Sequence, residues 1–245
     1  MLISNYLQRY KETLLLLPKD TMLSKEDLLV DELLMERNGT LEMYYAPHNE
    51  YINPSARVII VGITPGWTQM RIAIQVAVKG LIVGLSDEEV CRGAKEAARF
   101  AGTMRNNLIN MLDTLDLHQQ LNIASCEELF KENQGLLHTT SLLRFPVFFK
   151  KNNYSGTHPN LISSPYLKEF ALVSLREELS IMKHALIIPL GKTAESVLQL
   201  LVGEDKLDAK ACLWGFPHPS GANGHRHKQF ADHQDHMKRI VKDLF

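Results

Sequence analysis

Four short apolar runs, separated by helical stretches with clear boundary signals, constrain the fold of this chain more than any other feature. The first run, 57–61, is rich in β-branched residues and lacks polar alternation, as expected for a strand buried on both faces. Similar runs occupy 136–143, 185–190 and 211–216. Strands that alternate with helices form parallel sheets with right-handed crossovers. We therefore predict an α/β fold, a three-layer αβα sandwich with a central parallel sheet of about four strands.

Helix starts between these runs are marked by capping residues. Ser86 and Ser125 each begin a capping-box pattern, and Ser164 precedes a proline that suits a first helical position. The first fifty residues indicate two amphipathic helices, at about 3–17 and 24–36. The chain has 245 residues, of which 45% are apolar, and shows no repeat or linker. We predict one domain over 1–245, with 1–50 as a helical extension packed on it.

Charge and cysteine content limit the classes of partner and compartment. There are 27 Lys and Arg residues against 28 Asp and Glu, so no global positive field favours nucleic acid and any DNA contact must use a local patch. The three cysteines are far apart and fit neither a disulfide framework nor a CxxC metal site. The apolar run 14–17 is too short to cross a membrane. We expect a cytoplasmic monomer with no membrane partner and no cofactor.

Two loops carry the residues best suited to chemistry, because each follows an apolar run where ligands bind in parallel sheets. Gly62-Ile63-Thr64-Pro65-Gly66 follows the first run, and its glycines allow backbone amides to approach a ligand. His218-Pro219-Ser220 follows the last run, and the prolines on both sides fix the direction of the imidazole. The alternative is that the first loop is an ordinary turn and that the histidine is merely exposed.

In their order and positions these two loops resemble the signature motifs of the uracil-DNA glycosylases, over roughly residue 57 to the C-terminus. Three further segments strengthen the resemblance. Phe100-Ala101-Gly102 resembles the segment that supplies a base-stacking aromatic residue, 139–144 resembles the second strand, and 190–194 resembles the third strand and its turn. The resemblance implies a uracil-DNA glycosylase-like fold and a protein of DNA repair that binds uracil or another damaged base in DNA.

The resemblance also implies a set of site residues. A base in a duplex must be flipped out before it is cleaved, and its departing negative charge needs a fixed donor. His218 would be that donor. Thr64 would occupy the position of the residue that positions or polarises the attacking water. Base contacts would come from Gly62, Ile63, Pro65, Gly66, Phe100 and Ser141, and phosphate or DNA contacts from Ser220, Asn223, Arg226 and Lys228.

The sequence departs from the family at positions that carry the chemistry. Active members have Asp, Glu or Asn in the first motif where this chain has Ile63 and Thr64. Ser141 stands where many members read the base with Asn, and one hydroxyl cannot make a two-pronged amide contact. Two functions therefore stay open: a monofunctional DNA glycosylase, and a member of altered or no activity that binds a base, nucleotide or nucleic acid.

Two other classes of site were weighed. The C-terminal stretch holds five histidines, which raises a metal site, although no cysteine completes a ligand set; the histidines are His218, His225, His227, His233 and His236. We predict no metal. Gly191-Lys192-Thr193 ends like a P-loop, but that motif needs a glycine where this chain has Leu186. No GxGxxG follows a strand, so a dinucleotide site is excluded as well.

Overall fold

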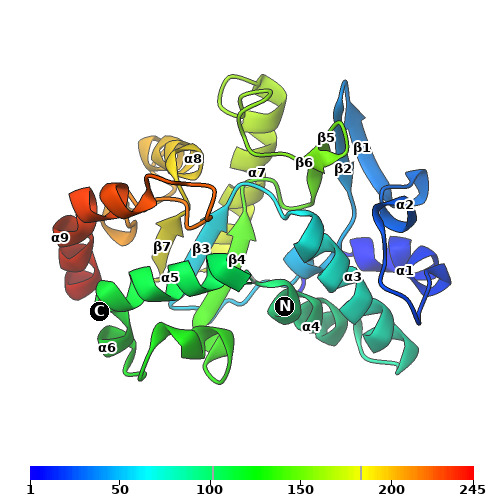
Figure 1. The fold of residues 1–245 in the computed structure, drawn as a ribbon, viewed down its shortest axis with the longest axis horizontal. Coiled ribbons are helices and arrows are strands. Elements are labelled where there is room, and N and C mark those ends of the chain that lie inside the picture. Colours follow the sequence, from blue (N-terminus) through cyan, green and yellow to red (C-terminus); the bar gives the residue numbers. More distant parts are fainter. Residues whose placement is uncertain (101, 183) are drawn as a thin grey trace. The chain divides into compact units, whose positions relative to one another are not determined.

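The computed structural model describes residues 1–100, 102–182 and 184–245, and the chain within it forms two compact units (Figure 1). The first unit contains Met1–Ile52, Thr64–Arg99 and Leu143–Asn160. The second contains Asn53–Ile63, Phe100–Leu142 and Leu161–Phe245. Each unit is therefore assembled from three separate stretches of sequence. The single glycosylase-like domain stays a prediction.

A parallel sheet forms the centre of the second unit. Its strands are β3 (Val58–Gly62), β4 (Leu137–Ser141) and β7 (Leu186–Pro189), in the order β4-β3-β7. Both partners of β3 run parallel to it, and Gly62 pairs with Ser141 at the carboxyl end. Residues 58–61 have no exposed surface, which confirms the prediction of a strand buried on both faces.

The fourth predicted strand, 211–216, is much shorter in the structure than the sequence indicates. It makes one parallel bridge, between Cys212 and Ile187, and Leu213 N donates to Ile187 O at 2.9 Å. A 3-10 turn, η5 (Ala209–Ala211), occupies its beginning, and the left-handed backbone of Gly215, with φ of +82°, ends the extended stretch. The turn and this glycine leave too few residues for a regular ladder.

Helices cover both faces of this sheet and give the predicted three layers. Alternate strand residues, Val58, Ile60, Leu186 and Ile188, belong to one core cluster with side chains of α5 (Gly102–Thr114), α6 (Leu117–Leu121) and α9 (Arg226–Leu244). The 3-10 helices η3 (Cys126–Phe130) and η4 (Gln134–Leu136) lead into β4. On the other face lie α7 (Pro165–Ile181), which begins at Ser164 as predicted, and α8 (Lys192–Gly203).

The first unit contains an antiparallel sheet that the sequence reading missed. The first predicted helix is present as α1 (Tyr6–Leu16), but the second is limited to α2 (Lys25–Leu28) and the 3-10 turn η1 (Asp31–Leu33). The chain then forms the hairpin β1 (Leu34–Asn38) and β2 (Leu41–Tyr44), which continues through β5 (Val147–Phe149) and β6 (Asn152–Asn153). The prediction of a helix over 24–36 is thus wrong, because Gly39, with φ of +60°, supports a tight turn.

Two long helices complete the first unit. They are α3 (Trp67–Ile82) and α4 (Asp87–Ala98), and the predicted capping box at the start of α4 is confirmed: Ser86 Oγ accepts from Glu89 N, and the Glu89 carboxylate accepts from Ser86 N. The 3-10 turn η2 (Pro47–Glu50) packs against α4 and carries buried polar residues. Among the described residues, no helix combines the length and apolar character that a membrane span requires.

Candidate active site

The start of the first loop lies at the carboxyl end of the parallel sheet. Gly62 is the last residue of β3, and a Cβ at this position would lie 3.7 Å from Ser141 Oγ on β4. Leu142 N donates to Gly62 O at 2.9 Å, so the ladder continues past the paired residues. Gly62 and Ser141 are therefore direct neighbours, with half-buried Ile63 next in the chain.

Thr64 is fixed by two hydrogen bonds to backbone within the first unit. Its hydroxyl donates to Phe145 O at 3.0 Å and accepts from Val147 N at 3.0 Å. A hydroxyl has one hydrogen and two lone pairs, so only one lone pair is left. Thr64 can therefore accept a hydrogen bond from a water molecule but has no hydrogen to donate to it.

The end of the first loop is held at the N-terminus of α3. Pro65 is buried, and Gly66 N donates to Gln69 Oε1 at 3.1 Å. Trp67 N donates to Asn153 Oδ1 at 2.8 Å. These side chains satisfy amides that a helix start leaves without partners, so they fix the loop by capping.

The His218-Pro219-Ser220 loop is built into the second unit. Pro217 and Pro219 are buried, and Asn107 of α5 donates from Nδ2 to Pro219 O at 2.8 Å. Gly191 N donates to Phe216 O at 3.0 Å. A Cβ at Gly191 would lie 3.3 Å from His218 Cβ, and its φ is +83°, so only glycine lets the turn after β7 approach this closely.

The imidazole of His218 has a defined tautomer and charge. Ser220 N donates to His218 Nδ1 at 3.3 Å, so Nδ1 is an acceptor and the proton resides on Nε2. Burial lowers the pKa of His218 from its usual value of 6.5. The ring is therefore neutral at pH 7 and carries a hydrogen-bond donor at Nε2.

The side chains predicted to contact phosphate differ in how far their polar atoms are already used in hydrogen bonds within the loop. Ser220 Oγ accepts from Ala222 N at 3.2 Å. Asn223 uses its amide inside the loop, donating to His218 O at 3.2 Å and to Gln229 Oε1 at 3.0 Å, and accepting from His225 N. Its side chain thus positions the histidine loop.

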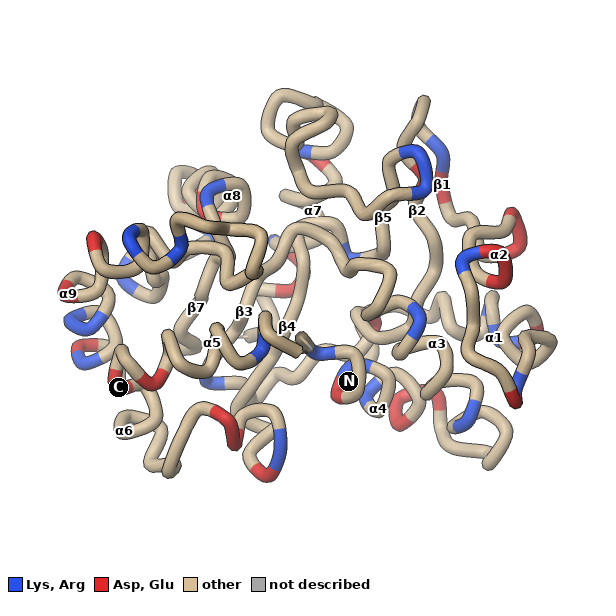
Figure 2. The backbone as a smooth tube through the Cα atoms, viewed as in Figure 1, with Lys and Arg blue, Asp and Glu red and all other residues tan. Residues whose placement is uncertain are grey.

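Arg226 and Lys228 lie in the first turn of α9. Arg226 Nη1 donates to Asn223 O at 3.4 Å, and its buried Nε has no hydrogen-bond partner within the described part of the chain. A crevice of about 140 Å³ between α5 and α9 is lined by Arg226 together with Asn107 and Thr114. Lys228 is exposed and forms an ion pair with Asp232 at 2.7 Å. Figure 2 shows acidic and basic positions interleaved along α9, so the positive charge is local.

Phe100 belongs to the hydrophobic core of the second unit. Its side chain is 7% exposed and packs with the cluster that includes Leu108 and Phe130. Arg105 Nε donates to Phe100 O, which ties the preceding backbone to α5. Ala101, the middle residue of the predicted stacking segment, lies outside the described residues.

The C-terminal histidines do not gather into a ligand set. α9 carries His227, His233 and His236, and His225 precedes it. Across the parts of the chain that the structure describes, no group of three or more His, Cys, Asp or Glu residues is placed to hold a metal ion.

The structure places the predicted residues in three groups. Gly62, Ile63 and Ser141 lie at the carboxyl end of the central sheet, where the turn after β7 also contacts His218. Thr64, Pro65 and Gly66 belong to the first unit, and the arginine and lysine lie on α9. That both loops line one cleft stays a prediction.

Three residues that organise these loops were missed by sequence reasoning: Gln69, Asn107 and Asn153. Gln69 could have been found, since it stands three residues after Gly66, the spacing of a capping box. Asn107 and Asn153 act on backbone more than eighty residues away in the chain, and no local pattern indicates such contacts.

Comparison with known proteins identifies the family to which a chain with this geometry belongs. Residues 50–245 match the uracil DNA glycosylase superfamily, and the chain belongs to that family. The fold is accordingly uracil-DNA glycosylase-like. The chain is also 43% identical over 239 residues to the uncharacterized protein YoxB of Bacillus subtilis (strain 168), a match that covers 97% of this chain and 93% of that protein.

Proposed function

We propose that this protein is a DNA glycosylase that releases uracil or another damaged base from DNA. The observation that carries the proposal is the neutral His218, whose Nδ1 accepts from Ser220 N and whose Nε2 therefore holds a proton for a ligand. In the reaction the C1′–N bond breaks and its electron pair goes to the base. Water then adds to C1′ and releases a proton to solvent, and the released base anion takes up a proton to become neutral.

His218 would act on the departing base. Negative charge develops on the pyrimidine carbonyl as the bond breaks, and a fixed N–H donor stabilises that charge more in the transition state than in the substrate. A neutral imidazole is suited to this because its acceptor nitrogen is already occupied by backbone. Asn107, Gly191 and Asn223 would be positioning residues that hold the loop.

The remaining predicted residues would bind base and phosphate. Ser141 Oγ at the end of β4 would contact the base edge, beside the backbone of Gly62 and Ile63. A base could stack on Phe100 only through the small part of its ring that the core leaves exposed. Arg226, which lines the crevice between α5 and α9, would bind a phosphate together with Ser220. Lys228 would add a weaker, solvent-exposed charge.

The direct test is release of uracil from single- and double-stranded oligonucleotides, measured in single turnover. His218→Ala should slow release about 100-fold, since removing a fixed oxyanion donor costs roughly 3 kcal/mol. His225→Ala is the matched control, because that exposed histidine lies in the same loop region but outside the Ser220 hydrogen bond. An unchanged rate in His218→Ala, with normal thermal unfolding, would remove this residue from the site.

A second candidate function, base binding without hydrolysis, is favoured by the hydrogen bonds of Thr64. The hydroxyl is occupied by Phe145 O and Val147 N and carries no charge, so it stabilises neither the cationic sugar nor the attacking water strongly. A carboxylate there would be worth ~4 kcal/mol at an effective dielectric of about 20. Binding of a uracil-containing oligonucleotide without release would support this function.

Thr64→Asn tests the contribution of this position. An amide retains one donor for Phe145 O and adds polar atoms that can orient water, so we expect single-turnover release to rise at least about tenfold. Thr64→Ser, which keeps the hydroxyl, is the control and should leave the rate near that of the wild type. If wild type releases uracil rapidly and Thr64→Asn slows it, Thr64 itself orients the water.

A further inference from the structure

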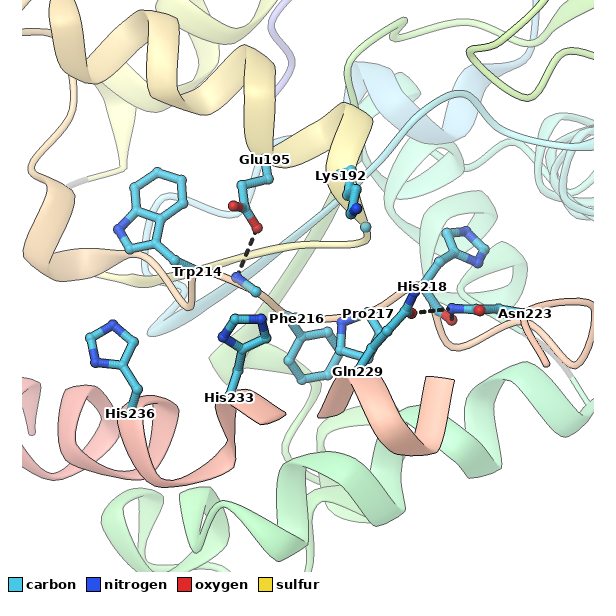
Figure 3. Close-up of a pocket in the computed structure, with 12 residues that line it drawn as sticks. Lys192, Glu195, Trp214, Phe216, Pro217, His218, Asn223, Gln229, His233 and His236 are labelled. Atoms are coloured by element: carbon cyan, nitrogen blue, oxygen red, sulfur yellow. Dashed lines mark hydrogen bonds between the residues drawn. The ribbon is translucent and has the colours of Figure 1, made fainter. Parts of the chain in front are cut away.

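A second cavity of the second unit lies between α8, α9 and the extended stretch 212–217. Its volume is about 320 Å³, which is at the lower end of the range for small-ligand sites. Trp214, His233 and His236 line one end, and Glu195 and Lys192 come from α8 (Figure 3). His218 also contributes to the lining, but Figure 3 draws its ring at the opposite end from Trp214.

We propose that this cavity binds a nucleotide whose base carries an exocyclic amino group, separately from the base that His218 would contact. The first argument is the aromatic lining. Trp214 is half-buried and its Nε1 donates to Ala209 O at 2.9 Å, which fixes the indole. Fixed aromatic rings are platforms for nucleobases because every base has a π face on which it can stack.

The His233 ring packs against Gly215, where any larger residue would clash with it. A Cβ at Gly215 would lie 2.6 Å from Cγ of the His233 ring, and the φ of Gly215 is +82°. The imidazole therefore packs against bare backbone at the edge of the cavity, while the rest of this exposed residue faces solvent. Together with His236, one helical turn further along, it offers ring surface near the indole.

The polar groups of the cavity match the rest of a nucleotide. Glu195 Oε2 accepts from Gly215 N at 2.7 Å, which holds the carboxylate at the cavity wall, and its remaining lone pairs can accept from an exocyclic amino group. Lys192 is exposed and makes no ion pair among the described side chains, so its ammonium is available for a phosphate. Adenine, guanine and cytosine carry such an amino group, whereas thymine does not.

Tryptophan fluorescence tests this site directly. The sequence has two tryptophans, so Trp67→Phe leaves Trp214 as the single reporter. Titration with deoxyadenosine monophosphate should quench this emission to saturation, with thymidine monophosphate binding at least about tenfold more weakly. A trideoxyadenylate that binds more tightly than the mononucleotide indicates single-stranded nucleic acid as the natural ligand, and equal binding indicates a free nucleotide. If neither deoxyadenosine monophosphate nor trideoxyadenylate quenches the emission to saturation, the proposal is wrong.

Variants read by calorimetry separate the proposed contacts. Trp214→Ala should weaken deoxyadenosine monophosphate about tenfold, and Trp214→Phe should recover part of that loss, because a phenyl ring also stacks. Lys192→Ala should weaken the nucleotide about fivefold but leave deoxyadenosine unchanged. Equal effects of Lys192→Ala on both would contradict the phosphate contact. Trp214→Ala, at the end of the cavity away from the His218 ring, should leave uracil release unchanged, so failure of either site is recognised separately.

Discussion

Glu178→Ala should lower the free energy of unfolding by about 3–5 kcal/mol, because it breaks a buried pair. Glu178 on α7 and His138 on β4 have side chains that are 1% and 0% exposed, and His138 Nε2 lies 2.5 Å from Glu178 Oε1. Asn53 N donates to His138 Nδ1, so Nε2 holds the proton that is shared with the carboxylate. Without Glu178 that buried donor loses the carboxylate it is paired with, and the core loses volume.

Chemical denaturation monitored by circular dichroism gives the measurement. Glu177→Ala is the matched control, since this glutamate is the preceding residue of the same helix and is exposed. We expect a change under about 1 kcal/mol for it. Replacing both partners, as in His138→Leu with Glu178→Leu, should restore part of the loss, because neither buried side chain of the pair then lacks the other, although Asn53 N loses its acceptor at His138 Nδ1. A loss below 1 kcal/mol for Glu178→Ala would show that the pair is not a determinant of stability.

Acid should destabilise the wild type strongly through His48. This residue of η2 is 3% exposed, neither ring nitrogen has a hydrogen-bond partner among the described residues, and burial together with the charge of Lys95 lowers its pKa to about 3. The pKa of His48 in the folded protein lies below its unfolded value of 6.5. At pH values between these two pKa values, the unfolded chain therefore binds more protons than the folded one. The contribution of neutral His48 to the free energy of unfolding is therefore fully present above pH 6.5 and is lost as the pH decreases toward 3. Between pH 6.5 and 3.5 the contribution is about 4 kcal/mol.

His48→Phe removes the titration and should flatten this dependence. At pH 7 the variant should be at least as stable as the wild type, since the ring nitrogens make no hydrogen bonds that the phenyl ring would lose. His227→Gln is the control, because this histidine is exposed and should leave the pH slope unchanged. Unfolding free energies measured at intervals from pH 7 to 4 would contradict the assignment if wild type and His48→Phe had parallel curves.

Local patterns were sufficient for the strand β3 of the second unit and for the start of one helix in each unit. The run 57–61 coincides closely with β3, and the capping serines Ser86 and Ser164 precede α4 and α7. Such features depend on neighbours in the chain. The antiparallel sheet was missed because β2 pairs with β5, about a hundred residues away, and because the Asn38-Gly39 turn follows directly on the segment 24–36, whose apolar spacing is that of a helix.

The sequence was sufficient to predict which residues form the candidate site, but not which hydrogen bonds these residues make. His218 was identified from the prolines around it, whereas its tautomer depends on the amide of Ser220, which only the folded loop reveals. Thr64 has the same sequence signal whether its hydroxyl faces a ligand or the backbone, and the structure shows the backbone bonds. Glu178 had a local signal that was not used: an acidic residue on the apolar face of α7, between Leu175 and Met182.

The interleaved composition of the two units has a consequence for how the protein is made. The strand β3 is synthesised early, yet its partners β4 and β7 leave the ribosome only after much of the chain has followed. The first unit likewise waits for its last segment, Leu143–Asn160, which contains β5. Domains that are continuous in sequence can fold during translation, from the N-terminus onward. In a ribosome-bound nascent chain, the first unit should therefore stay protease-sensitive until Asn160 has emerged, and the second until nearly all of the chain has emerged.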